Sequence, residues 1–118
     1  MTQVYLTFRA LEDLQEIYDY SLEKWGEKVS LNYMRKLEDA LKLLENQPNL
    51  LRINPAVSSR FVLFPVEQHY LICDCWGMDI VVLTVKHVSM NLLDRLKDLE
   101  TTLEAEARAL YQRIADSR

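Results

Sequence analysis

The chain has 118 residues, of which 49% are hydrophobic, so it is long enough for one compact domain with a single core. Fourteen Lys and Arg stand against eighteen Asp and Glu, and the net charge of −4 argues against strong direct binding to nucleic acids. No stretch holds the ~20 apolar residues that a membrane span requires, and the first residues lack the features of a signal peptide. We therefore expect a cytoplasmic protein that does not enter membranes.

A short strand and two helices are predicted in the N-terminal part. The segment VYLTF at residues 4–8 is β-branched and aromatic, which favours a strand. Apolar residues then recur at helical spacing over residues 10–25, and Gly26 supplies the left-handed conformation that ends a helix. A second helical pattern covers residues 29–44 and stops before a proline. Because only a short turn separates them, the two helices are expected to form an antiparallel hairpin that covers a sheet, with Trp25 as a core anchor.

After an irregular stretch at residues 46–59, residues 60–87 predict three strands in a meander. In the last of these strands both alternating sets of side chains are apolar, so both faces of the sheet need a cover, and the hairpin provides only one. Cys73 and Cys75 lie on the same face of the middle strand. Two cysteines alone do not complete a zinc site, so we expect reduced thiols and no metal ion.

The C-terminal part predicts one long helix over about residues 91–115, with Asn91 or Ser89 as the N-cap. Such a helix measures ~37 Å at 1.5 Å per residue, longer than we expect a domain of this size to cover. Part of its apolar stripe would then contact a partner chain, or the helix would pack back onto the second sheet face. We expect one unit, with a core over residues 1–90 and an extension over 91–118. The candidate residues for self-association are Leu96, Leu99, Leu103 and Leu110.

Four segments carry a family resemblance through their order and spacing. They are ALEDLQEIYDYSLEKWG, NYMRKLEDALKLLENQPNL, SRFVLFPVEQHYLICDC and VVLTVKHVSMN, the last of which ends in His87, Met90 and Asn91. Over about residues 3–95 the chain resembles the ParE branch of the RelE/ParE superfamily of toxins from type II toxin-antitoxin modules. The resemblance implies an α+β fold of order β-α-α-β-β-β, with an antiparallel sheet packed on a helical hairpin. Asn91 replaces the usual Asp, and the long C-terminal helix lies outside the resemblance.

For ParE proteins the resemblance implies inhibition of DNA gyrase by direct binding and neutralisation by a cognate antitoxin. The sister RelE-like branch cleaves messenger RNA on the ribosome, and a third hypothesis is a non-toxic relative that assembles through its C-terminal helix. RNA cleavage needs clustered cations with a general acid or base, for which the sheet offers Arg60, His69, Lys86 and His87, with Tyr70 as a proton donor. Such scattered groups and the acidic balance favour binding over catalysis. No cofactor-binding motif is present, so no cofactor is expected.

The candidate binding residues fall into two sets. Arg60, Lys86 and His87 are the candidate contacts to the target, and Arg60 is also a candidate partner for an antitoxin carboxylate. An exposed sheet face with a groove is expected to take an amphipathic segment of the antitoxin, laid down as a helix or added as a strand. The apolar contacts for that segment are Tyr70, Trp76 and Leu83.

Overall fold

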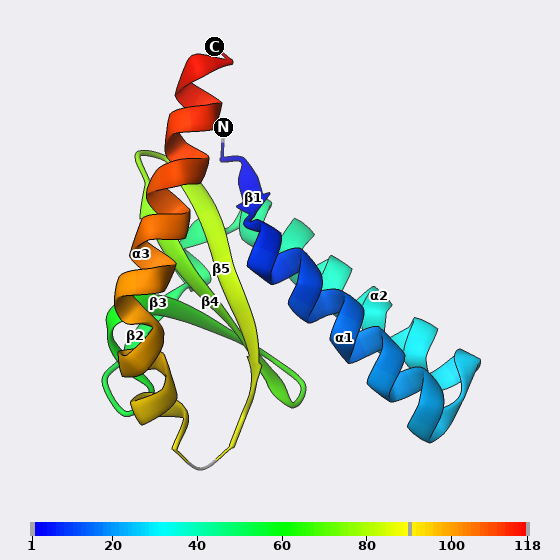
Figure 1. Cartoon of the computed structure of the whole chain (residues 1–118). Coiled ribbons are helices and arrows are strands. Elements are labelled where there is room, and N and C mark those ends of the chain that lie inside the picture. The colour runs from blue at the N-terminus through cyan, green and yellow to red at the C-terminus, as the bar shows by residue number, and fades with distance from the viewer. Residues whose placement is uncertain (1, 90, 118) are drawn as a thin grey trace.

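The computed structural model describes residues 2–89 and 91–117, and its fold is α+β as predicted, with one short strand added (Figure 1). The stretch that the sequence left irregular contains a turn of 3-10 helix and a three-residue strand. The elements are β1 (Val4–Leu6), α1 (Phe8–Trp25), α2 (Glu27–Asn46), η1 (Pro48–Leu50), β2 (Arg52–Asn54), β3 (Ser58–Val66), β4 (His69–Trp76), β5 (Asp79–His87) and α3 (Leu92–Asp116).

The five strands form one sheet in the order β1-β5-β4-β3-β2. The predicted meander of β3, β4 and β5 is confirmed, and β2 adds to its edge in antiparallel orientation. β1 pairs in parallel with β5, where Val4 lies opposite Ile80. This pairing brings the N-terminus of the chain to the strand that precedes α3, so α1 and α3 both begin close to β5.

The α1–α2 hairpin covers one face of the sheet, and a single residue joins its two helices. Thr7 caps α1 by accepting a hydrogen bond from the Ala10 amide at 3.1 Å, and its hydroxyl donates to the Leu83 carbonyl oxygen at 2.8 Å. Gly26 separates the helices with a φ of 88°, a region that favours glycine. The core on this face contains, from the hairpin, Ala10, Leu37, Ala40 and Leu44 and, from the sheet, Leu71, Cys73, Ile80 and Val82.

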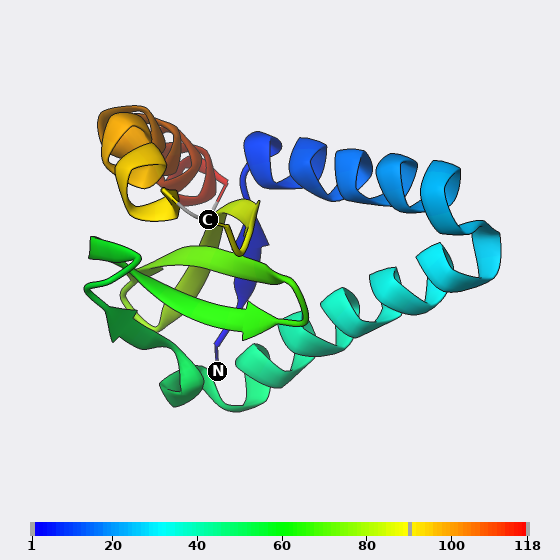
Figure 2. The ribbon, with the colours of Figure 1, turned by 90° about the horizontal axis from the view of Figure 1, so that it is seen from below.

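The expectation that Trp25 anchors the core is wrong. Its side chain is 55% exposed at the far end of the hairpin, edge-on to Tyr20 at a ring-centroid distance of 5.8 Å, and the Lys24 ammonium lies over both rings. The hairpin leaves the sheet before its helices end, as Figure 2 shows, so the turn at Gly26 has no sheet beneath it. Trp25 is therefore a surface residue next to the turn.

The long helix α3 lies along the opposite face of the sheet, which is one of the two roles considered for it (Figures 1 and 2). Ile114, near its C-terminal end, is still 8% exposed, so the expectation that the domain is too small to cover this helix is wrong. The buried residues of α3 run from Leu92 to Ile114, so one side of the helix contacts the fold along almost its whole length. Of the four leucines considered for self-association, Leu96 and Leu103 are buried under the helix, and Leu99 and Leu110 are partly buried against the same core.

Two further expectations concern cysteines and membranes. Cys73 is buried and Cys75 is exposed, both as free thiols, and burial raises the pKa of the Cys73 thiol. Among residues 2–89 and 91–117 no group of three or more His, Cys, Asp or Glu side chains is placed to hold a metal ion. No helix within the same residues is long and apolar enough to cross a bilayer.

Candidate functional site

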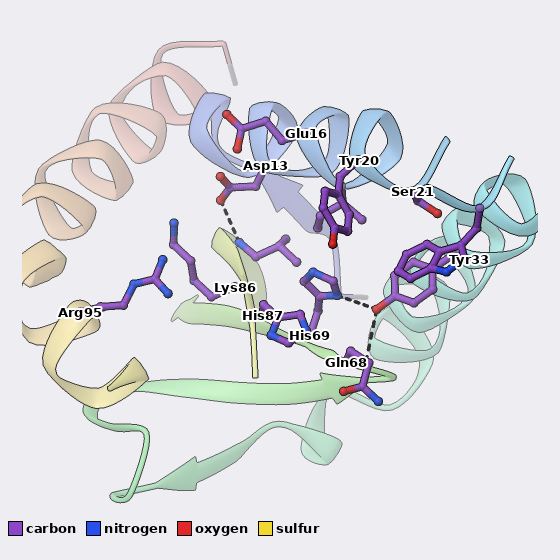
Figure 3. Close-up of a pocket in the computed structure, with 13 residues that line it drawn as sticks. Asp13, Glu16, Tyr20, Ser21, Tyr33, Gln68, His69, Lys86, His87 and Arg95 are labelled. Atoms are coloured by element: carbon purple, nitrogen blue, oxygen red, sulfur yellow. Dashed lines mark hydrogen bonds between the residues drawn. The ribbon is translucent and has the colours of Figure 1, made fainter. Parts of the chain in front are cut away.

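A cleft of about 430 Å³ opens between the α1–α2 hairpin and the end of β5 (Figure 3). Five elements contribute to it, because the hairpin departs from the sheet where β5 ends and the β3–β4 turn and the first turns of α3 come close. Its polar and aromatic lining consists of Asp13, Glu16, Tyr20, Ser21, Trp25, Tyr33, Gln68, His69, Lys86, His87 and Arg95.

The floor of the cleft is a hydrogen-bonded pair of aromatic side chains. The hydroxyl oxygen of Tyr33 on α2 lies 2.5 Å from Nδ1 of His69, and it accepts a hydrogen bond from the Gln68 amide at 3.3 Å. The ring of His87 packs edge-on against His69 with 5.2 Å between ring centroids, because the two residues are direct partners across β4 and β5. The register of two strands and one residue of the hairpin thus fix this cluster.

Burial and a neighbouring charge set the protonation of the pair. Burial, and then the charge of His87, lower the pKa of His69 to about 4. Burial raises the pKa of Tyr33, while the hydrogen bond from the Gln68 amide opposes that change. At neutral pH both groups are therefore uncharged, so the Tyr33 hydroxyl donates to Nδ1 and the His69 proton resides on Nε2.

This chemistry suits binding better than proton transfer. A general acid or base works best with a pKa near the operating pH, and His69 is unprotonated and weakly basic at neutral pH. Its hydrogen bond to Tyr33 also ties up the nitrogen that would accept a proton. We conclude that the pair holds the cleft in shape.

The walls of the cleft carry opposite charges. Asp13 and Glu16 lie on α1, and Lys86 and Arg95 approach from β5 and α3 (Figure 3). Asp13 also caps the edge of β5 where β1 has ended, since its carboxylate accepts hydrogen bonds from the Thr84 hydroxyl and, at 3.0 Å, from the Val85 amide. Within the described residues no ion pair joins the two walls, so the cations remain available to a ligand.

The structure places the three predicted target contacts in two separate parts of the molecule. Lys86 and His87 lie together in the cleft beside His69. Arg60 lies on the other face of the sheet, where its Nε donates to the Glu104 carboxylate of α3 at 2.9 Å and its guanidinium is 3.7 Å from the Asp74 carboxylate. Arg60 therefore does not share a site with the other two.

The predicted antitoxin contacts all lie on the sheet face that α3 covers, so the expectation of an exposed face is wrong for the chain as it is folded here. Leu83 is fully buried in the core between the sheet and α3, and Tyr70 packs against that core. Trp76 stacks on Tyr111 of α3 with 4.8 Å between ring centroids. The sequence placed these three residues on one face correctly but did not identify what covers it.

Sequence reasoning missed several residues of the cleft. Tyr33 lies within the helical pattern predicted over residues 29–44, where nothing distinguishes it from core residues, and Asp13 gave no signal beyond its place in the family-like segment. Arg95 lies in the first turn of α3, at the end of the resemblance. The register of the meander was the one usable signal, since it pairs His69 with His87 directly. Met90, part of the quoted closing motif, lies outside the described residues.

Comparisons with known proteins address the family. The family described as "ParE toxin of type II toxin-antitoxin system, parDE" matches residues 4–92. Toxin ParE1 of Caulobacter vibrioides is 24% identical over 86 residues, which cover 73% of this chain and 88% of that protein.

A solved structure shares the fold. A chain titled "Chromosomal ParDE TA system from P. aeruginosa" aligns with a TM-score of 0.66 and 21% identity, over 75% of this chain and 98% of its own length. At that identity the likeness supports the fold alone, and the family match supplies the rest. The chain belongs to the ParE toxin family of type II toxin-antitoxin systems.

Proposed function

We propose that this chain inhibits DNA gyrase by direct binding in the cytoplasm and is neutralised by a cognate antitoxin. The observation that carries the proposal is the family match over residues 4–92 together with a cleft that Lys86 and Arg95 line. Lys86 and His87 at the end of β5 are the contacts that we assign to the target. Arg95 joins them from α3.

The cleft favours a protein target over RNA as a substrate. A metal-free ribonuclease needs a base and an acid poised near neutral pH around a scissile phosphate. Here burial and His87 lower the pKa of the half-buried His69 to about 4, and the wall opposite the cations carries Asp13 and Glu16, which repel a phosphate backbone. An apolar mouth with Tyr20 and Trp25, both more than half exposed, suits a protein surface, since aromatic residues are common anchors in protein interfaces.

The test is a supercoiling assay with purified gyrase and increasing amounts of the full chain. We expect loss of supercoiling, and we expect Lys86→Ala and His87→Ala each to weaken inhibition about tenfold, as residues at the centre of an interface do. Lys42→Ala is the matched control, because Lys42 is an exposed lysine of α2 away from the cleft. A ribosome-dependent messenger RNA cleavage assay runs in parallel. Normal supercoiling with cut message would replace this proposal by the RelE-like activity, and no effect in either assay would favour the non-toxic relative.

A further inference from the structure

The strand β5 is longer than the strand that pairs with it on one of its two sides. β1 lies parallel to residues 80–82 of β5, and after Thr7 the chain turns away into α1. β5 continues to His87, and among the residues that the structure describes no strand lies beside residues 83–87 on this side (Figure 1). We call residues 85–87 the open edge of β5.

The hydrogen bonds along β5 show which backbone groups face the open edge. The Val88 amide donates to the Gln68 carbonyl oxygen at 2.8 Å, on the side of β4. Because neighbouring residues of an antiparallel strand turn their backbone groups to opposite sides, the N–H and C=O of His87 face the open edge. Val85 has the same orientation, since its amide donates to the Asp13 carboxylate of α1 at 3.0 Å. Within the described part of the chain no hydrogen bond reaches the His87 amide.

The cleft opens onto this edge, because Val85, Lys86 and His87 are among the residues that line it. Its volume of about 430 Å³ lies within the range of pockets that hold ligands. A strand edge with unpaired backbone groups is a template on which an extended segment of another chain can form main-chain hydrogen bonds. The cleft therefore offers a partner backbone groups as well as side chains.

The charges beside the open edge define the side chain that such a segment carries. Lys86 and Arg95 line one wall of the cleft, and neither forms an ion pair within the described residues (Figure 3). Asp13 and Glu16 line the wall on α1, and the Asp13 carboxylate is already hydrogen-bonded to β5. An acidic side chain is therefore attracted to Lys86 and Arg95 and repelled by α1.

We propose that an extended segment of the target adds to the open edge as a further strand and directs an acidic side chain to Lys86 and Arg95. The inference rests on the proposed function, because it takes gyrase as the target. In either strand orientation the His87 N–H donates to a carbonyl oxygen of the segment. Tyr20 and Trp25, both more than half exposed at the mouth of the cleft, then pack against the segment.

Two substitutions of His87 separate the main-chain hydrogen bond from the side chain. His87→Ala and His87→Pro both remove the imidazole, but only His87→Pro removes the N–H. No hydrogen bond to β4 is lost, because that N–H faces the open edge. In a supercoiling assay with purified gyrase, half inhibition should need about tenfold more His87→Pro than His87→Ala. Equal inhibition by the two variants, with similar urea unfolding midpoints, overturns the inference.

Charge reversal tests the acidic side chain of the segment. Lys86→Glu and Arg95→Glu should each weaken inhibition by about tenfold or more, because each places a carboxylate where the segment brings its own. Lys42→Glu is the matched control, since Lys42 is an exposed lysine of α2 away from the cleft, and it should leave inhibition unchanged. Inhibition by both cleft variants at the level of the control overturns the requirement for an acidic side chain.

Hydrogen exchange of the unmodified chain gives a second readout that does not depend on how a variant folds. The His87 amide should exchange freely in the chain alone and become protected when purified gyrase is added. The amides of Val85 and Val88 are the internal controls, because both are hydrogen-bonded before gyrase is added. Protection of His87 in the chain alone that grows with its concentration overturns the inference, because a second copy would then occupy the open edge.

The same experiment distinguishes the two proposals. A full chain that neither binds nor inhibits gyrase overturns the proposed function itself. Gyrase binding that leaves the His87 amide unprotected overturns only the addition of a strand at the open edge.

Discussion

The two faces of the sheet are covered in different ways. The α1–α2 hairpin buries its near halves on one face and carries its far end beyond the sheet, where Tyr20, Trp25 and Val29 are about half exposed (Figure 2). On the other face α3 follows the sheet with buried residues from Leu92 to Ile114. The hairpin therefore leaves a cleft beside the sheet that charged side chains line. The helix α3, in contrast, closes the other face and forms ion pairs along both of its sides.

The two covers also differ in their relation to the family match, because the hairpin lies inside it and α3 lies almost wholly outside it. The hairpin lies within the family match and forms a wall of the cleft, so its overhang belongs to the surface that we propose for the target. The helix α3 lies almost wholly beyond that match, and its Glu106 and Glu104 carboxylates accept hydrogen bonds from Arg9 and Arg60. Substitutions on the two faces are therefore expected to have different effects, which the following predictions compare.

The largest expected effect tests whether the two covers are equally important for folding. Leu44→Ala on the hairpin face and Leu103→Ala on the α3 face each remove a fully buried side chain, so each should lower the free energy of unfolding by about 2–5 kcal/mol. Leu31→Ala, at a site that is 47% exposed, is the control and should cost less than about 1 kcal/mol. Urea unfolding measures all three. A cost for Leu103→Ala as small as that of the control would mean that α3 does not cover the sheet in solution.

A second prediction concerns how stability depends on pH. This dependence should arise on the hairpin side of the sheet, because His69 lies there. Its pKa is lowered from 6.5 to about 4 by burial and by the charge of His87, so the unfolded chain binds a proton more readily than the folded one. This contribution to stability is complete above pH 6.5 and is lost as the pH falls toward 4. The free energy of unfolding should fall by less than about 1.4 kcal/mol for each pH unit in this range, because the ring is only half-buried.

The matched variant is His69→Asn, which keeps an amide near the position of Nδ1 and removes the titrating ring. Unfolding free energies at about pH 7 and about pH 5 should differ more for the unmodified chain than for this variant. Leu103→Ala, on the other face, should keep the pH dependence of the unmodified chain. An equal pH dependence with and without His69 would contradict the assigned protonation.

A third, smaller effect concerns the charged margins. The Arg9–Glu106 pair is joined by three hydrogen bonds, and each side chain is about one-third exposed, whereas Lys36–Glu67 on the hairpin side is a single contact of 3.3 Å between half-exposed groups. Double-mutant cycles with alanine should give a coupling energy of about 1 kcal/mol for the first pair and near zero for the second. Equal coupling energies would mean that the Arg9–Glu106 pair holds α3 no more firmly than an ordinary surface ion pair holds its partners.

The sequence predicted the regular elements well, because each depends on local periodicity. The helices over residues 8–25, 27–46 and 92–116 and the meander differ from the predicted ranges by a few residues at most. β2 was missed because three residues beside a proline carry no alternation that a pattern can detect. For α3 the periodicity identified the apolar stripe, but not whether the sheet or another chain covers it.

The candidate site was harder to predict, because it depends on which elements meet. Lys86 and His87 were identified from their place at the end of a strand, and the structure adds His69 through the register of β4 and β5. Tyr33 could not be distinguished from the core residues of its stripe, since its role depends on the position of a turn 35 residues away. Trp25 was misplaced because a tryptophan beside a helix turn is usually buried, and here the hairpin overhangs the sheet.

The smallest expected effect concerns Asn91, at the start of α3. Asn91 occupies the N-cap position of α3 in the left-handed conformation, with a φ of 70°, and its side chain makes no capping hydrogen bond. The family resemblance places Asp at this position. Asn91→Asp should change the unfolding free energy by less than about 0.5 kcal/mol, because Asn tolerates the left-handed region slightly better while Asp favours the helix dipole.

Asn91→Gly should likewise be neutral or slightly stabilising, since glycine adopts a positive φ without strain, and Asn91→Val should cost more than either. The ranking in urea unfolding therefore reports backbone conformation and not side-chain capping. A loss of about 1 kcal/mol in Asn91→Gly, the size of a lost cap, would contradict it. If the predicted ranking holds, Asn91 in place of the usual Asp does not change the stability of α3. The polar contacts that hold α3 are then those of Glu104 and Glu106, whose carboxylates accept hydrogen bonds from the rest of the fold.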